Sequence, residues 1–209
     1  MAKKKKQEER DDSMTLPDGM LVYGHLFVKQ QYNDASKPQY SAEAVYDEDD
    51  LIECGFYDAV DAIMEEEGWE EGDEGFNHPA KDGNKKAKRR EKKGKDGSAY
   101  EDKIILKATT DFNKDGDDDS GGVQVYDEDV NEIDFTEKKS MYNGCIIRMG
   151  IKLKAYEMSE DNYGVKCYLT AVQRAGDGER LGGSSDHSSL FEKVGRKGKD
   201  KKKKKKRKG

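Results

Sequence analysis

The sequence is poor in hydrophobic residues, and this shortage limits how much of the chain can pack. Hydrophobic residues make up 33% of its 209 residues, whereas charged residues make up 40%. A chain of this length and composition is expected to form one domain with a small core and solvated additions. No apolar run approaches the ~18 residues of a membrane span, and the lysines at 3–6 precede Gln7-Glu8-Glu9, where a signal peptide would have its hydrophobic segment. We therefore expect a soluble protein that is not secreted and has no membrane partner.

Cysteine is scarce as well, and its spacing excludes two kinds of stabilising site. The three cysteines, Cys54, Cys145 and Cys167, are far apart, odd in number and without a C-x-x-C pair or an accompanying histidine pattern. A disulfide framework and a zinc site are therefore not expected. Cys167 falls on the apolar side of a predicted strand, which favours a buried, reduced thiol and a reducing cytosol.

The sequence also lacks the motifs of the common enzyme classes. His25, His78 and His187 have no Ser, Cys or Asp partner in a recognisable nucleophile motif, and no phosphate-binding glycine pattern is present. The acidic runs at 47–50 and 115–119 could in principle hold the two magnesium ions of a nuclease, but carboxylate runs are more typical of solvated turns. We predict that the chain is not an enzyme and needs no cofactor.

One acidic loop has part of a calcium-binding pattern. Asp111, Asn113 and Asp115 supply oxygen ligands at positions 1, 3 and 5, and Gly116 stands at position 6. The twelfth position is Gly122, where a calcium loop requires a bidentate Glu, and strands are expected on both sides. A hydrated loop is therefore favoured over a metal site.

The net charge of −6 hides a strong segregation of charge along the chain. Residues 1–10 carry +3 and residues 196–209 carry +10, which leaves −19 for residues 11–195. A further basic block of nine Lys and Arg residues at 81–95 follows an acidic run at 65–74. Blocks of like charge are usually solvated, so a disordered basic leader at 1–15 and a disordered basic tail at 184–209 are expected.

Between these ends the pattern predicts a β-rich domain over residues 16–183. Strands are expected at 21–29, 39–46, 103–110 and 123–126. A helix is expected from the spacing of Ile52, Phe56, Val60 and Ile63, with a cap pair Asp50 and Glu53 and a stop at Gly68. Residues 68–99, rich in Gly and charge, are expected to be a long flexible insertion with Trp69 and Phe76 as its anchors.

Two consecutive stretches near the C-terminal end, Ile146 to Tyr156 and Val165 to Arg174, alternate with a period of two. Side chains of a strand point alternately to its two faces, so a hairpin with a turn at 158–162 is expected. Its apolar face has Ile147, Met149, Ile151, Leu153 and Ala155, then Val165, Cys167, Leu169 and Ala171. Its other face has Arg148, Lys152, Lys154 and Tyr156, then Lys166, Tyr168, Thr170 and Arg174.

A cationic face interleaved with aromatic rings suits a single-stranded nucleic acid. Phosphates are attracted by positive charge, and unpaired bases stack on flat rings. The alternative is an ordinary solvated face. Five or six strands with one or two helices and no repeat favour an antiparallel barrel over a doubly wound sheet, which would need alternating helices.

Several short motifs occur in a fixed order along this part of the chain. They are Lys37-Pro38-Gln39-Tyr40-Ser41, Leu106-Lys107-Ala108-Thr109, Tyr142-Asn143-Gly144-Cys145 leading to Arg148, Ala155-Tyr156, and Gly164-Val165 through Leu169-Thr170-Ala171-Val172-Gln173 to Asp177-Gly178-Glu179-Arg180-Leu181-Gly182-Gly183. Together, over residues 16–183, they resemble the T-seven-like phage single-stranded DNA-binding proteins.

The resemblance implies a five-stranded antiparallel OB-fold barrel that coats single strands in viral replication and recombination and helps them anneal. It implies single-stranded DNA as the partner, with phage polymerase, helicase or recombination proteins as further partners, in the cytoplasm of the infected host cell. A homodimer is compatible with it, and it brings no catalytic residues.

The resemblance places the DNA on the cationic face of the barrel. The expected contacts there are Arg148, Lys152, Lys154, Tyr156, Lys166, Tyr168 and Arg174. Lys107, Tyr23 and Lys29 are second-rank candidates, whereas Phe27 on the same face as Tyr23 is assigned to the core.

The C-terminus differs from that of these relatives, which is typically acidic, ends in an aromatic residue and recruits replication partners. Here it ends in Lys201 to Lys206, Arg207, Lys208 and Gly209. We hypothesise that the basic ends, together with Lys86, Arg89 and Arg90 of the basic block, attract DNA that an acidic body would repel. An RNA-binding protein or nucleic-acid chaperone that uses the same barrel is the alternative function.

Overall fold

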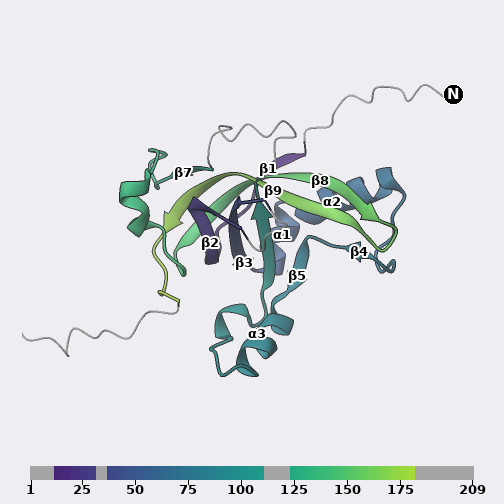
Figure 1. Ribbon diagram of the computed structural model, residues 1–209, viewed down its shortest axis with the longest axis horizontal. Coiled ribbons are helices and arrows are strands. Elements are labelled where there is room, and N and C mark those ends of the chain that lie inside the picture. Colours follow the sequence, from purple (N-terminus) through teal and green to yellow (C-terminus); the bar gives the residue numbers. More distant parts are fainter. Residues whose placement is uncertain (1–11, 32–36, 111–122, 182–209) are drawn as a thin grey trace, which may run out of the picture.

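The computed structural model describes residues 12–31, 37–110 and 123–181, and within these ranges the chain is mostly β-sheet (Figure 1). The strands are β1 (Ser13–Thr15), β2 (Gly19–Gln30), β3 (Gln39–Tyr46), β4 (Phe76–Asn77), β5 (Ala80–Asp82), β6 (Ile104–Thr109), β7 (Gln124–Tyr126), β8 (Ile146–Ser159) and β9 (Asn162–Gly176). The helices are α1 (Glu48–Glu53), α2 (Phe56–Glu67), α3 (Gly83–Glu91) and the 3-10 helices η1 (Ser98–Tyr100) and η2 (Phe135–Ser140). The predicted basic tail, the calcium-like loop at 111–122 and residues 1–11 of the leader lie outside the described residues.

All nine described strands belong to one sheet, in which five long strands pair in a closed circuit. β2 pairs with β3, β3 with β6, β6 with β9, β9 with β8, and β8 with β2. The predicted number of five strands is wrong, because β1, β4, β5 and β7 add to this circuit as pieces of only two or three residues. Such pieces are too short to show an alternating pattern in the sequence.

The expected antiparallel arrangement is also wrong for part of the sheet. β9 pairs in parallel with β4, β6 and β7, while its pairing with β8 is antiparallel. Strand direction depends on which distant segments become neighbours, and periodicity carries no information about that. The predicted leader likewise includes β1, which pairs with β8 through Met14 and Ile151.

The hairpin predicted near the C-terminal end is confirmed, and its strands are longer than expected. β8 and β9 continue to Ser159 and Asn162, so the connection is shorter than the predicted turn at 158–162. Figure 1 shows both strands curving over one side of the molecule. On the apolar side of β8, the residues Ile147, Met149, Ile151 and Leu153 are buried as predicted.

A bulge in β9 breaks the alternation on which the second half of the prediction depended. The partner of Gly150 is Ala171 and the partner of Ile151 is Leu169, so β9 contains one extra residue, Thr170. Beyond the bulge the faces exchange: Val172 is fully buried, whereas Ala171, predicted to be in the core, is partly exposed. Arg174 therefore lies on the same side of β9 as Val172 and not on the cationic face.

A similar irregularity corrects the prediction for β2. Its pairing with β3 shifts between Leu21 and Tyr23 and again between His25 and Gln30. As a result Val28, which a regular alternation would place on the same face as the buried Val22 and Leu26, is 58% exposed. Phe27 packs against the core, as predicted.

The predicted single helix is two helices, α1 and α2, that supply one side of the main core. Gly55, with φ of 75°, separates the two helices. α1 begins directly after Asp47, so the predicted cap pair is wrong, and the first apolar residue of the pattern, Ile52, is exposed. α2 buries Phe56, Val60, Ile63 and Met64 and ends at Gly68, as predicted. Among the described residues, no helix is long and apolar enough to cross a membrane.

Candidate nucleic-acid interface

The segment predicted as a flexible insertion forms part of the sheet and one wall of a cleft. Residues 68–99 contain β4, β5, α3 and part of η1. β4 pairs with β9, whereas β5 pairs with β6. Residues 76–82 therefore connect β9 to β6 beside the short stretch in which these two strands pair with each other.

A glycine allows β4 to lie close enough to β9 to pair with it. Gly164 has φ of 151°, and a Cβ atom at this position would lie 2.3 Å from the carbonyl oxygen of Asn77. No larger residue fits there without a shift of the backbone. The glycine thus permits β4 and β9 to pair, which the β-propensity of this segment would not predict.

Helix α3 follows β5 and is held against the sheet despite its high charge. The backbone N–H of Asn84 donates to the carboxylate of Asp82 at 2.8 Å, which caps the first turn. Ala87 and Tyr100 are buried in a second, smaller core cluster with Ile105. Basic residues in the last turn of the helix also interact favourably with its dipole. Figure 1 shows α3 projecting from the sheet beyond β5.

A cleft of about 1160 Å³ lies between α3 and the sheet. One wall is α3 itself, with Lys85, Lys86, Arg89, Arg90 and Lys93 at the cleft. The other wall and the floor are formed by Phe76, Asn77, His78, Pro79, Ala80, Lys81, Asp82, Gln39, Glu43, Ile105, Lys107, Thr109, Tyr156, Val165, Lys166 and Cys167. The structure thus brings six of the predicted site residues together: Lys107, Tyr156, Lys166, Lys86, Arg89 and Arg90.

The cleft contains one carboxylate that is largely covered. Glu43 on β3 pairs across the sheet with Lys107, and its side chain forms an ion pair with Lys86 of α3. Lys86 also lies 4.8 Å from the centre of the Tyr100 ring. The ion pair connects α3 to the sheet and neutralises a charge that would repel a phosphate, whereas Asp82, which also lines the cleft, caps the first turn of α3.

Beside the cleft, the exposed side of the β8–β9 hairpin carries a ring flanked by cations. The ammonium groups of Lys154 and Lys166 lie 5.1 and 4.9 Å from the centre of the Tyr168 ring, and Lys152 is opposite Tyr168 in the register. Tyr168 is half-buried, so the ring is supported without being covered. Since Lys166 also lines the cleft, this surface continues into it.

Tyr156 is at the end of this row, beside the aromatic wall of the cleft. Burial raises the pKa of its hydroxyl, while a hydrogen bond with Asn77 acts in the opposite direction. The tyrosine therefore remains a neutral, partly exposed ring at physiological pH.

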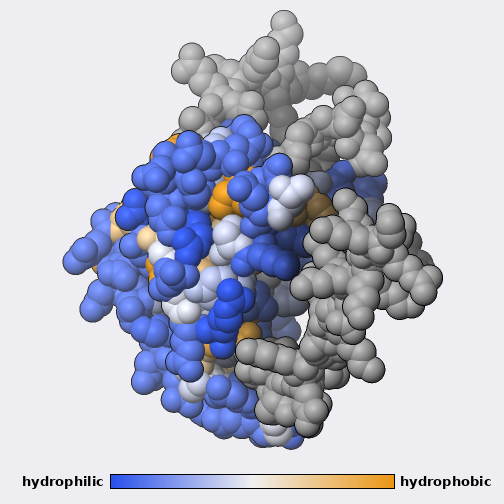
Figure 2. All heavy atoms as spheres, turned by 90° about the vertical axis from the view of Figure 1, so that its left-hand side faces the viewer, coloured by the Kyte–Doolittle hydropathy of each residue, from blue (hydrophilic) through white to orange (hydrophobic). Residues whose placement is uncertain are grey.

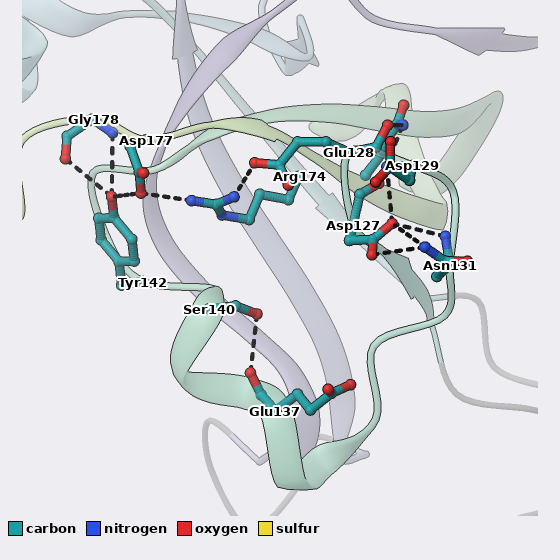
Figure 3. A network of polar contacts seen from close by, with 11 residues as sticks. Asp127, Glu128, Asp129, Asn131, Glu137, Ser140, Tyr142, Arg174, Asp177 and Gly178 are labelled. Carbon is teal, nitrogen blue, oxygen red and sulfur yellow. Dashed lines mark hydrogen bonds and ion pairs between the residues drawn. The ribbon is translucent and has the colours of Figure 1, made fainter.

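Two of the predicted arginines lie away from the cleft and have carboxylate partners. Arg148 forms a hydrogen-bonded ion pair with Asp18 at 2.6 Å. Arg174 forms ion pairs with Glu128 and Asp177 and is only 14% exposed (Figure 3). A hydrogen bond from the hydroxyl of Tyr142, followed by the Arg174 guanidinium, lowers the pKa of the Asp177 carboxyl. This network stabilises the end of β9, and it leaves the Arg174 guanidinium paired with carboxylates instead of available to a phosphate.

The remaining candidates on β2 also lie outside the cleft. The hydroxyl of Tyr23 donates to the side chain of Gln30 at 2.9 Å, and its ring contacts His25 edge-on. The ammonium group of Lys29 lies 5.7 Å from the centre of the Tyr40 ring. These residues form a separate surface.

The sequence reasoning missed Phe76 and His78 as cleft residues and did not predict that the basic block forms a helix, α3. Lys85, Arg89 and Lys93 recur every four residues, and this spacing was a usable signal for one face of a helix. Phe76 was expected as an anchor only, and no signal in the sequence placed His78 beside it. Within the parts of the chain that the structure describes, no three Asp, Glu, His or Cys side chains gather into a group that could hold a metal ion.

The side of the molecule that carries β7 and η2 offers a different surface. Figure 2 shows that its described part is hydrophilic over most of its area, with hydrophobic residues visible in small, separate patches. Phe135 of η2 is 50% exposed, with the Lys138 ammonium group 3.7 Å from its ring centre.

Comparison with known proteins adds a family and a fold. Residues 17–203 match the protein family described as Enterobacter phage Enc34, ssDNA-binding protein. The fold is similar to that of the single-stranded DNA-binding protein from bacteriophage Enc34 in complex with ssDNA, with a TM-score of 0.64, 15% identity, and coverage of 82% of this chain and 90% of that one. The single-stranded DNA-binding protein gp2.5 of bacteriophage T7 is similar with a TM-score of 0.50, 14% identity, and coverage of 91% and 100%. No curated protein matches the chain.

Proposed function

The chain belongs to the family of phage Enc34 single-stranded DNA-binding proteins, and from this premise we propose that it binds single-stranded DNA without sequence preference in viral replication, recombination and strand annealing. The observation that supports this most is the cleft beside α3, in which basic side chains and aromatic rings converge. Phosphate neutralisation and base stacking are the two interactions that such binding requires. The protein acts by coating the strand and carries out no catalytic step.

We interpret the circuit of β2, β3, β6, β9 and β8 as the barrel of an OB-fold. Two observations support this interpretation: the closed order of strand pairings and the fold similarity to two phage single-stranded DNA-binding proteins. In this interpretation the short strands β4, β5 and β7 decorate the barrel, and the cleft lies on its outer surface.

The proposal also includes the setting in which the protein works. A phage protein of this kind acts in the cytoplasm of the infected host cell, beside polymerase, helicase or recombination proteins.

The test is a titration of the full chain with fluorescent oligo-dT, the matching RNA and a duplex of the same length, at two salt concentrations. We expect tighter binding of oligo-dT than of duplex, because only unpaired bases can stack. A double variant, Lys107→Ala with Lys166→Ala, should weaken binding and reduce its salt dependence, whereas Arg148→Ala, outside the cleft, should leave both nearly unchanged. Equal affinity for duplex and single strand would contradict the proposal, and a preference for RNA would favour a nucleic-acid chaperone.

A further inference from the structure

The two walls of the cleft differ in chemistry. The α3 wall presents basic residues only: Lys85, Lys86, Arg89, Arg90 and Lys93. The facing stretch Phe76 to Pro79 contains no Lys, Arg, Asp or Glu, and it consists of two rings, an amide and a proline. Tyr156 joins this second wall, because it hydrogen-bonds with Asn77.

The uncharged wall is aromatic and is supported from behind. The ring of His78 stacks on that of Tyr57, with centres 5.9 Å apart and planes at 22°. Phe76 meets His78 edge-on at 6.3 Å and also contacts Trp69 at 6.0 Å. Rings that are already packed lose little conformational freedom when a base stacks on them.

His78 has the character of an uncharged ring. Its Nδ1 atom lies 3.1 Å from the backbone nitrogen and 3.4 Å from the carbonyl oxygen of Ala80, so the backbone of β5 fixes the orientation of the ring. Burial lowers its pKa, so the imidazole is neutral at physiological pH. A neutral ring attracts a base and has no charge to offer a phosphate.

The charged wall is arranged to follow a backbone. Lys85 and Arg89 lie four residues apart on one face of α3, about 6 Å along its axis at about 1.5 Å per residue, and Lys93 follows in the turn after the helix ends at Glu91. All three are exposed. Lys86 and Arg90 lie against the Tyr100 ring at 4.8 and 5.4 Å, which holds this second row in place.

We propose that a single strand lies in the cleft with its phosphates toward α3 and its bases toward Phe76 to Pro79 and Tyr156. This assignment of the two faces of the strand rests on the proposed function and makes it more specific. Lys107 and Lys166 lie between the walls and contact the strand from the floor of the cleft.

The test compares oligo-dT with an oligonucleotide of the same length whose central nucleotides are abasic, so that the phosphates remain and the bases are absent. His78→Ala should weaken binding of oligo-dT by roughly 5- to 150-fold, the usual effect of losing one stacked base. The same variant should bind the abasic strand as the wild-type protein does. Arg89→Ala should weaken both strands alike and lower the salt slope by about 0.7, as expected for one phosphate contact on a single strand.

Two matched controls lie on other surfaces. His25→Ala removes an imidazole from β2, and Lys139→Ala removes an exposed cation from η2; neither residue lines the cleft. Both variants should bind the two strands with wild-type affinity. Tyr156→Ala provides a second test of the aromatic wall that does not depend on the stability of the His78 stack.

Trp69 gives an independent measurement, because it is the single tryptophan of the chain and lies 6.0 Å from Phe76. Its emission should change more with oligo-dT than with the abasic strand. The inference is overturned if His78→Ala and Tyr156→Ala weaken both strands equally, or if neither weakens binding of oligo-dT. In both cases a preference of the wild-type protein for oligo-dT over duplex would leave the proposed function intact.

Discussion

Tyr168 shows how one side chain can combine the two interactions that a single strand needs. Two ammonium groups lie within about 5 Å of its ring centre, at 5.1 and 4.9 Å. A base that stacks on the ring therefore brings its phosphate close to a cation. Arg148 and Arg174 have equal charge but are paired with carboxylates, so charge alone does not identify a contact.

The first prediction is that replacing a tyrosine and replacing a lysine on this surface change DNA binding in different ways. Tyr168→Ala should weaken oligo-dT binding by about 1–3 kcal/mol, the cost of one stacked base, and leave the salt slope unchanged. Lys166→Ala should lower the salt slope by about 0.7. Binding isotherms over a series of salt concentrations measure both quantities. Tyr23→Ala, an exposed tyrosine outside the cleft, is the control, and a lower salt slope for Tyr168→Ala would contradict the prediction.

The second prediction concerns pH and His78. Because burial lowers the pKa of this imidazole, the unfolded chain binds a proton more readily than the folded one does. The free energy of unfolding should therefore fall as pH falls below about 6.5, the ordinary histidine pKa, and stop falling below the pKa of the folded state. Urea unfolding across this pH range measures the effect, and His78→Gln should reduce the slope; an unchanged slope in this variant would contradict the prediction.

At the scale of elements, α3 depends on a small contact area. Its buried side chain is Ala87, whose neighbours include Tyr100 and Ile105. Gly97 approaches it so closely that a Cβ on that glycine would lie 2.8 Å from the carbonyl oxygen of Ala87. The main core, in contrast, is formed by residues of the long strands together with α1 and α2. The helix can therefore be displaced separately from the rest of the fold.

The third prediction uses this separation. Ala87→Leu adds volume to a packed contact, which typically costs about 1–3 kcal/mol, and should displace α3. Amide hydrogen exchange should increase in residues 83–91 and remain unchanged in β8, while the affinity for oligo-dT should fall. Lys88→Leu, on the exposed side of the same helix, is the matched control. If the amides of α3 remain fully protected from exchange in the Ala87→Leu variant, the prediction is contradicted, because the contact then accommodates the larger side chain.

At the scale of the whole molecule, charge is segregated in space as well as along the chain. Residues 47–77 contain 14 acidic residues and no Lys, Arg or His, and all of these acidic residues are exposed. They belong to α1, α2 and the loop before β4, whereas the basic block forms α3. A polyanion is repelled by the first surface and attracted by the second, so we expect the charge distribution to direct DNA to the proposed site in the cleft.

The fourth prediction concerns the C-terminal segment 196–209, which carries +10. Charges act on a phosphate mainly within about 8 Å at physiological salt, so this segment must approach the DNA to contribute. Its deletion should weaken binding of both single strand and duplex and lower the salt slope. A tail of the same length with serine in place of each basic residue is the control for chain length and should behave as the deletion does. Unchanged affinity and slope would refute this contribution.

Much of the fold was predictable wherever a strand or helix is long and buried on one side. The range of β3, the presence of the β8–β9 hairpin, the apolar side of β8 and the stop of α2 at Gly68 follow from periodicity and from glycine. The predictions failed at Thr170, where one extra residue reverses the faces, and at Val28, where the register shifts. Bulges are caused by pairing with a partner strand, and a single strand's pattern does not contain them.

The sequence by itself determined the composition of the interface: basic blocks, alternating tyrosines and lysines, and an acidic remainder. These depend on residue type and local spacing, which are present in the unfolded chain. Only the tertiary structure decided which of these residues meet. It joined Phe76 and His78 to Tyr156 and Lys166, and it turned Arg174 toward Glu128 and Asp177. Such contacts arise from long-range strand pairing and from the packing of Ala87 of α3 in one cluster with Tyr100 and Ile105, and both require the whole chain to be folded.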